Sequence, residues 1–283
     1  MIKIIKFSNG SGYNKLTNFL DQRRNSNNTD VDLVNKIIND VKKNKLKALK
    51  KYEKKYSKNK EIKLSKKKIN NSIKYLDQNV KKAIDFAYER IFKFHKLQIK
   101  NFKKIKFVDK YKNKLEYKSI PIDSVGVYVP GNLPSTLLMN CIPAKIAGVR
   151  RIILATPKIN NILNPAVLYA AKKLGIKEIF SMGGAQAIAS LAFIQKVNKV
   201  VGPGNKYVAE AKRQLSGKII GTETMYAGAS EICVLADKDS DISQVATSLV
   251  SQAEHDPDSQ CILVTKDKNL IKKTLIKVKK ILS

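Results

Sequence analysis

Tryptophan is absent from this sequence, and histidine and cysteine are rare, with two and three residues among 283. Cys141, Cys233 and Cys261 are odd in number, far apart and set in apolar segments. That pattern excludes a dense disulfide framework and predicts buried thiols without disulfides, in a reducing compartment. No apolar run approaches the length that spans a membrane, and the N-terminus lacks the apolar core of a secretory signal. We therefore expect a cytoplasmic protein that does not bind membranes.

Acidic residues are also scarce: 23 Asp and Glu stand against 55 Lys and Arg, a formal net charge of +32. The excess is mostly lysine within residues 1–120, interleaved with Asn and Ile as in an AT-rich coding sequence. Proteins that read base sequence favour arginine, and single-strand binders need exposed aromatic side chains. With few arginines and no tryptophan, the chain is expected to have no specific nucleic-acid partner, only weak, salt-sensitive association with polyanions.

Residues 1–118 show helical periodicity. Asp30 and Asp77 are the expected N-caps of two helices, and Asn44 suits a left-handed stop between the first helix and another that follows it. His95 flanks the apolar stripe of the last helix and is predicted to be structural rather than catalytic. The apolar positions of the three helices are Val34, Ile37, Ile38 and Val41, then Leu46, Leu49 and Tyr52, then Val80, Ile84, Ala87, Ile91 and Phe94.

From Pro121 onward, short apolar runs alternate with Gly/Pro loops and helical windows, which predicts a mostly parallel sheet with helices on both faces. The fold class is therefore α/β: an N-terminal helical segment followed by a Rossmann-like sheet. The expected strands are Val125–Val129, Arg151–Ala155, Glu178–Met182, Lys199–Val201, Ile232–Ala236 and Cys261–Thr265. The expected helices are Thr136–Ala147, Pro165–Leu174, Ala185–Ile194, Lys206–Leu215, Ile242–Ala253 and Lys268 to the end.

Three regions are expected. They are a helical region at 1–118, a Rossmann-like domain at 119–237, and the truncated start of a second α/β unit at 238–283. Parallel sheets bind ligands at the carboxyl ends of their strands. Small-residue loops stand at four of these ends: 130–132, 183–186, 202–205 and 228–231. Each frees backbone N–H groups at a helix start, where phosphate is favoured. A G-x-G-x-x-G fingerprint is absent. From the loops alone, two interpretations are therefore about equally expected: that they are only tight turns, or that they bind a nucleotide-like ligand.

Gln252 and His255 stand one turn apart near the end of a helical window, where Asp256-Pro257 ends the helix. An amide oxygen and an imidazole at this spacing can reach one cation. Taken alone, the pair is more typical of a polar helix end with a solvated histidine, because glutamine is an unusual zinc ligand.

Six motifs, together with the N-terminal stretches 37–56 and 88–98, resemble histidinol dehydrogenases in the same order along nearly the whole chain. They are VGVYVPG (125–131), LMNCIPAKIAGV (138–149), GGAQAIASLA (183–192), VGPGNKYVAEAKR (201–213), ASEICVLAD (229–237) and SQAEHDPDSQCILVT (251–265). That family oxidises L-histidinol to L-histidine in two NAD-dependent steps, through an enzyme-held aldehyde at a zinc site.

The resemblance implies a role for particular residues. Gln252 and His255 would ligate zinc and contact the substrate, and Ser230 would be a further substrate contact. Tyr128, Gln186 and Asn205 occupy positions associated with NAD. The physical logic agrees, since two neutral ligands leave zinc the positive charge that holds histidinol for hydride loss.

Relative to the family pattern, the chain departs at two connections and at its end. The turn at 131–134 and the connection at 194–196 are short, and the family's usual Gly-Pro-Ser-Glu reads Gly228-Ala229-Ser230-Glu231. The Glu-His pair that performs acid–base catalysis, and an Asp and a His that complete the zinc site, are expected beyond Ser283. The last of these is supplied by the partner subunit of a homodimer. No catalytic residue is therefore expected within the chain itself. A non-catalytic NAD-binding remnant remains the alternative to an enzyme portion.

The lysine excess yields the first prediction. If it reflects composition rather than a binding face, DNA and RNA should bind weakly, without sequence preference, and dissociate as salt rises from about 50 to 200 mM. Fluorescence anisotropy with duplexes of unrelated sequence measures this. A sequence-selective complex that survives physiological salt would contradict the prediction and favour a nucleic-acid-binding protein.

Overall fold

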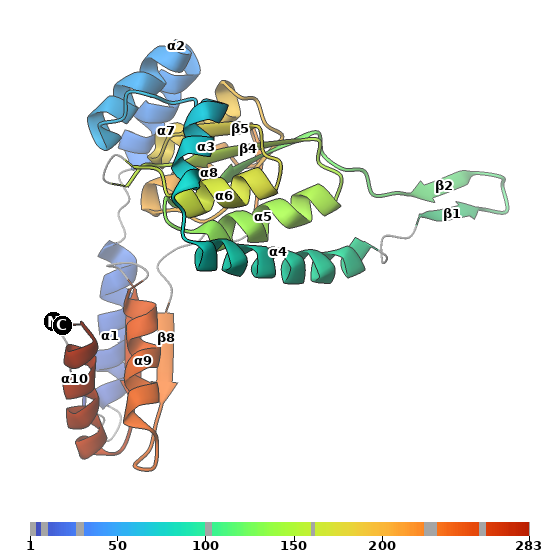
Figure 1. Ribbon diagram of the computed structural model, residues 1–283. Helices are drawn as coiled ribbons and strands as arrows, with labels where there is room; N and C mark the ends of the chain where they lie inside the picture. Colours follow the sequence, from blue (N-terminus) through green and yellow to red (C-terminus); the bar gives the residue numbers. More distant parts are fainter. Residues whose placement is uncertain are drawn as a thin grey trace. The chain divides into compact units, whose positions relative to one another are not determined.

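The structure is a computed structural model that describes residues 4–6, 11–26, 31–99, 104–159, 162–223, 231–254 and 259–282. By its internal contacts the chain divides into two units, Met1–Tyr226 and Ala227–Ser283. A five-stranded sheet of order β5-β4-β3-β6-β7 lies at the centre of the first unit, and all its pairs are parallel (Figure 1). Its strands are β3 Ser124–Tyr128, β4 Arg151–Thr156, β5 Glu178–Ser181, β6 Lys199–Val201 and β7 Gly221–Thr222.

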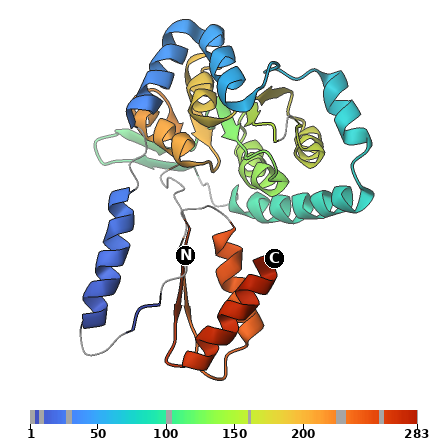
Figure 2. The same cartoon turned by 90° about the vertical axis from the view of Figure 1, so that its left-hand side faces the viewer.

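Side chains along the strands alternate between two apolar clusters, one on each face of the sheet. Val127 of β3 and Leu154 of β4 join one cluster, whereas Tyr128 and Ile153 join the other. The first cluster includes residues of α3 Lys66–Lys74, α4 Gln78–Gln98, α5 Pro134–Ile146 and α6 Pro165–Lys173. The second includes residues of α2 Val31–Ser57, α7 Gly184–Phe193 and α8 Lys206–Leu215 (Figures 1 and 2). The predicted fold class, a parallel sheet covered by helices on both faces, is confirmed.

The strands and helices expected after residue 121 are confirmed to within two residues at either end, although the short β7 was not predicted. The remaining elements are α1 Ser11–Ser26, β1 Ile105–Val108, β2 Lys114–Tyr117, β8 Glu231–Leu235, α9 Ile242–Ala253, β9 Gln260–Val264 and α10 Lys268–Leu282. None of the helices in the described ranges combines the length and apolar composition that crossing a bilayer requires.

α2 carries the predicted apolar stripe, with Val34, Ile37, Ile38 and Val41 buried, but its break lies at Lys45 (φ 48°) rather than at Asn44. The side chain of Asn44 instead donates a hydrogen bond to Asp40, 2.7 Å away. Tyr52, from beyond the break, donates to the same carboxylate at 2.9 Å. With Lys51 also bonded to it, these contacts hold the pKa of Asp40 at about 2. Asp40 thus joins the two halves of α2.

The predicted cap Asp30 lies outside the described residues, whereas Asp77 caps α4 as expected.

An antiparallel hairpin of β1 and β2 stands where the sequence was interpreted as helical. Asp109 forms its turn by accepting hydrogen bonds from the backbone N–H groups of Tyr111 and Asn113. The pairing places four apolar side chains on one face, each between 57 and 65% exposed: Ile105, Phe107, Leu115 and Tyr117. Apolar and polar residues alternate in these strands, a pattern that favours β structure. Each strand is only four residues long, however, and lies among lysines.

The unit boundary falls near residue 226 rather than at the predicted 118 and 237. α2 shares one apolar cluster with the sheet, and α3 and α4 share the other, so these three helices do not form a separate region. At the other boundary, β8 pairs in parallel with β9 and therefore belongs with residues 227–283.

The expectation that all three cysteines are buried is wrong. Cys141 on α5 is buried, whereas Cys233 on β8 is exposed and Cys261 on β9 is half-buried. β8 alternates between exposed and half-buried residues, with Leu235 78% exposed. One face of this two-stranded sheet is therefore open. An apolar strand sequence predicts burial only where both faces of its sheet are covered.

The three thiols should differ in reactivity. Burial raises the pKa of Cys141 to about 12, and because the thiolate is the nucleophile, Cys141 should resist alkylation in the native protein. Cys233 should react with iodoacetamide at the rate of an accessible thiol. Peptide mass spectrometry of native and urea-unfolded protein measures both, with Cys233→Ser as the control. Labelling of native Cys141 as fast as Cys233 would contradict the burial described.

Candidate functional site

The sheet reverses its direction of growth between β3 and β6. From β3 the chain adds β4 and then β5 on one side, and it returns to place β6 on the other. The carboxyl ends of β3 and β6 are therefore neighbours, and the loops that follow them, 129–133 and 202–205, diverge from one sheet edge. In open α/β sheets, ligands bind at this switch point. It is the location that the loops 130–132, 183–186 and 202–205 predicted, whereas the fourth predicted loop, 228–231, lies outside the described residues except for Glu231, where β8 begins.

The loop after β6 touches the backbone of β3. Gly202 has φ 106°, and a Cβ added to it would lie 2.0 Å from the carbonyl oxygen of Tyr128. Glycine is therefore required both by conformation and by space. The carbonyl of Gly202 accepts a hydrogen bond from the ammonium of Lys212, a buried α8 residue that is also paired with Glu223. The buried ammonium of Lys212 thus holds the loop 202–205 in place.

Two helices that begin at this edge lack a side-chain cap. Neither Leu133, the N-cap of α5, nor Gly183, the N-cap of α7, makes a side-chain capping bond. The Oδ1 of Asn205, by contrast, accepts from the N–H of Val208 at 3.2 Å and caps α8. In the described structure the Gly184 N–H of α7 donates to the Tyr128 hydroxyl, and no side-chain capping bond reaches the other first-turn N–H groups of α5 and α7. An anion is favoured at such helix starts. These backbone donors fit the pyrophosphate of a dinucleotide.

A buried carboxylate lies beneath the start of α7. Glu53 of α2 is fully buried, and its Oε1 accepts hydrogen bonds from the N–H of Gly183 and from Nε2 of Gln186, both at 2.9 Å. Asn59 donates to the carbonyl of Ser181 at 2.7 Å and lies 3.5 Å from Oε2 of Glu53. Burial raises the pKa of Glu53, while these donors oppose the rise.

Among the predicted NAD-side residues, Tyr128 and Gln186 lie within this buried cluster, 4% and 3% exposed, and Asn205 is exposed at the rim. The Tyr128 hydroxyl accepts from the N–H of Gly184 at 3.4 Å. Burial raises the pKa of Tyr128 to about 12, so its hydroxyl is neutral. Sequence reasoning missed Glu53 and Lys212. Their charges gave no signal, because each lies among other charged residues in its segment.

On the predicted zinc side, only Gln252 falls within the described residues, since Ser230 and His255 lie outside them. Gln252 is near the end of α9, and its Nε2 is buried without a hydrogen-bond partner in the described structure. This atom is a hydrogen-bond donor, whereas a cation would be bound by the amide oxygen of the same side chain. The described residues contain no group of three or more His, Cys, Asp or Glu that could hold a metal.

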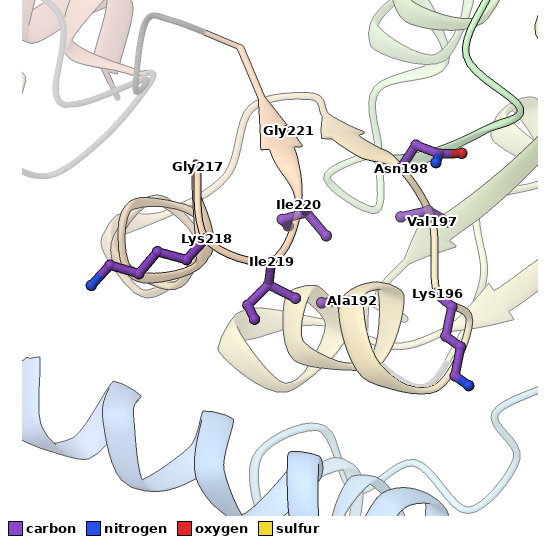
Figure 3. Close-up of a pocket in the computed structure, with 9 residues that line it drawn as sticks. All are labelled: Ala192, Lys196, Val197, Asn198, Gly217, Lys218, Ile219, Ile220 and Gly221. Carbon is purple, nitrogen blue, oxygen red and sulfur yellow. The ribbon is translucent and has the colours of Figure 1, made fainter.

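A pocket of about 480 Å³ opens at the opposite edge of the sheet (Figure 3). Val197 and Asn198, just before β6, line it together with Ile219 and Ile220, just before β7. The side chains of Lys196 and Lys218 point away from one another (Figure 3). Ligands of this fold class bind at the carboxyl edge, so this pocket is not part of the candidate site.

Known proteins resemble the chain over nearly its full length. The sequence model of one family, described as histidinol dehydrogenase, matches residues 20–283. A histidinol dehydrogenase of Pelagibacter ubique is 51% identical over 280 residues, covering 96% of this chain and 65% of that protein. One of Agrobacterium fabrum is 39% identical over 267 residues, covering 90% and 61%.

A solved structure agrees with these relatives. The crystal structure of histidinol dehydrogenase from Elizabethkingia anophelis matches with a TM-score of 0.76 and 38% identity, covering 89% of this chain and 60% of that one. The chain therefore spans about two thirds of the length of the relatives it matches. The resemblance read from the motifs is confirmed, and the chain belongs to the histidinol dehydrogenase family.

Proposed function

We propose that this chain forms the NAD-side portion of a histidinol dehydrogenase, which oxidises L-histidinol to L-histidine in two NAD-dependent steps during histidine biosynthesis. The observation that carries the proposal is the family match over residues 20–283, combined with an open binding edge at the sheet's switch point. In the proposal the full-length enzyme is a zinc-containing homodimer in the cytoplasm.

NAD lies along the carboxyl edge in this proposal. The open N–H groups at the starts of α5 and α7 bind the pyrophosphate, and exposed Asn205 is the direct side-chain contact. Tyr128 and Gln186 also belong to the NAD side. Because both are buried, they act by holding the backbone of residues 183–186 in place beneath the cofactor.

On the substrate side, Gln252 and His255 are proposed as two zinc ligands, and Ser230 as a contact to histidinol. When bound, zinc supplies the positive charge that orients the imidazole and amine of the substrate. The family match, whose range includes both Gln252 and His255, supports this assignment. The second candidate function, an NAD-binding remnant without catalysis, is favoured by the short connection at 194–196, which is closed by Lys196 in the left-handed region (φ 52°).

Activity provides one prediction. Residues 1–283 alone should not oxidise histidinol with NAD⁺ and Zn²⁺ supplied, because the acid–base pair and two zinc ligands are expected elsewhere. Adding a polypeptide that corresponds to the remaining third of the Pelagibacter ubique relative should give NADH production, measured by absorbance.

The chain's two histidines provide the matched pair of variants. In the complemented enzyme, His255→Ala should lower the rate by orders of magnitude, as expected for loss of a metal ligand. His95→Ala should leave it unchanged, since the described contacts of His95 are with Gln98 and Phe94 of its own helix. Turnover by residues 1–283 alone would overturn the assignment of the missing base. NAD⁺ binding without turnover after complementation would favour the remnant.

The Gly202 contact provides a prediction about binding. Gly202→Ala should weaken NAD⁺ binding by about tenfold or more, because the methyl group would displace the loop from the Tyr128 carbonyl. Gly217→Ala is the matched control, as Gly217 also has a positive φ (71°) but nothing lies within 4 Å of an added Cβ. Both substitutions strain the backbone, so both should lower the melting temperature. Isothermal titration calorimetry should show a loss of affinity for Gly202→Ala alone.

A further inference from the structure

The start of α7 is held from two sides. A Cβ on Gly183 would lie 2.9 Å from the Cβ of Pro157, so the chain before α7 packs directly against the loop after β4. On its other side lies Glu53, whose Oε1 binds the Gly183 N–H and the Gln186 side chain together. Gly183 and Gln186 bracket the first turn of α7, and one oxygen atom therefore fixes both ends of that turn.

This contact crosses 130 residues of sequence, from a helix of the outer layer to the rim of the sheet. The free-energy cost of burying Glu53 indicates that this contact is specific. Burying a carboxylate is unfavourable unless donors surround it, and Gly183, Gln186 and Asn59 provide those donors. A leucine at position 53 would fill the same volume without that cost, but it would leave two buried N–H donors unpaired.

We propose that Glu53 is a positioning residue for the cofactor: its hydrogen bonds to Gly183 and Gln186 set the first turn of α7 in the orientation that presents open N–H groups to the NAD pyrophosphate. The proposal rests on the proposed NAD function. The oxygen of Glu53 orients the turn as a hydrogen-bond acceptor and not through a negative charge. A negative charge at this helix start would repel the phosphate that binds there.

Two substitutions separate the acceptor from the charge. Glu53→Gln retains an oxygen that can accept from both Gly183 and Gln186, and it removes the charge. Glu53→Leu removes both. NAD⁺ titration by calorimetry should give an affinity for Glu53→Gln within about threefold of the unsubstituted chain, and at least a tenfold loss for Glu53→Leu.

Stability requires its own control. Asp40→Ala removes the bonds that join the halves of the same helix without touching Gly183. It should lower the melting temperature while NAD⁺ affinity stays unchanged. Because burial raises the pKa of Glu53, its ionisation lowers the stability of the fold as pH rises through the folded value. Glu53→Gln should therefore gain stability relative to the unsubstituted chain as pH rises above the ordinary pKa of a glutamate, whereas a lost structural bond would produce no such gain.

A measurement without cofactor completes the test. Hydrogen exchange of the peptide that contains Gly183 and Gly184 should accelerate in Glu53→Leu and remain slow in Glu53→Gln. Equal NAD⁺ affinity in both Glu53 variants, equal loss in both, or unchanged exchange in Glu53→Leu would each overturn the positioning role. If the unsubstituted chain fails to bind NAD⁺ while exchange responds as expected, the proposed function fails and the control of the turn by Glu53 stands.

Discussion

Burial of both faces of the parallel sheet is the constraint on which the remaining structure depends. Strands whose successive side chains enter two different clusters need a helical layer on each side. On one side, α7 and α8 do not cover the sheet alone, and α2 from the N-terminal part of the chain completes that layer. The same packing carries Glu53 to the start of α7. The geometry of the candidate site thus follows from how the sheet is covered.

The residues around the switch point divide into a rim and a support. The rim consists of backbone N–H groups and exposed Asn205, which are suited to contact a ligand. The support consists of buried polar groups, Glu53 on one side and Lys212 on the other, each bonded to the backbone of a glycine loop. A buried carboxyl group and a buried ammonium thus hold two loops of the same edge. Among so many exposed lysines, Lys212 stands out because it is buried, 3% exposed, and paired with Glu223.

Local sequence was sufficient for the elements after residue 121, because apolar runs of strand length are separated there by Gly and Pro. It also located the glycine loops at the carboxyl edge. It was not sufficient for features that depend on distant partners. Glu53 belongs to a lysine-rich segment, and only its contact with Gly183 distinguishes it from its neighbours. Cys233 occupies an apolar strand, but its exposure is decided by what covers that face of the sheet. The break of α2 missed its predicted position by one residue, because Asn44 bonds to Asp40 instead of adopting the left-handed conformation.

The long sequence separation between α2 and α7 also has a consequence for synthesis of the chain. The apolar stripe of α2 packs in the same cluster as α7, which begins at Gly184. At about 5–20 residues per second, the ribosome needs on the order of ten seconds to make the intervening chain. Throughout that interval Val34, Ile38 and Leu49 lack their native neighbours on α7. The many lysines of the same segment then repel other nascent chains and oppose aggregation, a benefit of the excess positive charge that does not depend on any binding partner.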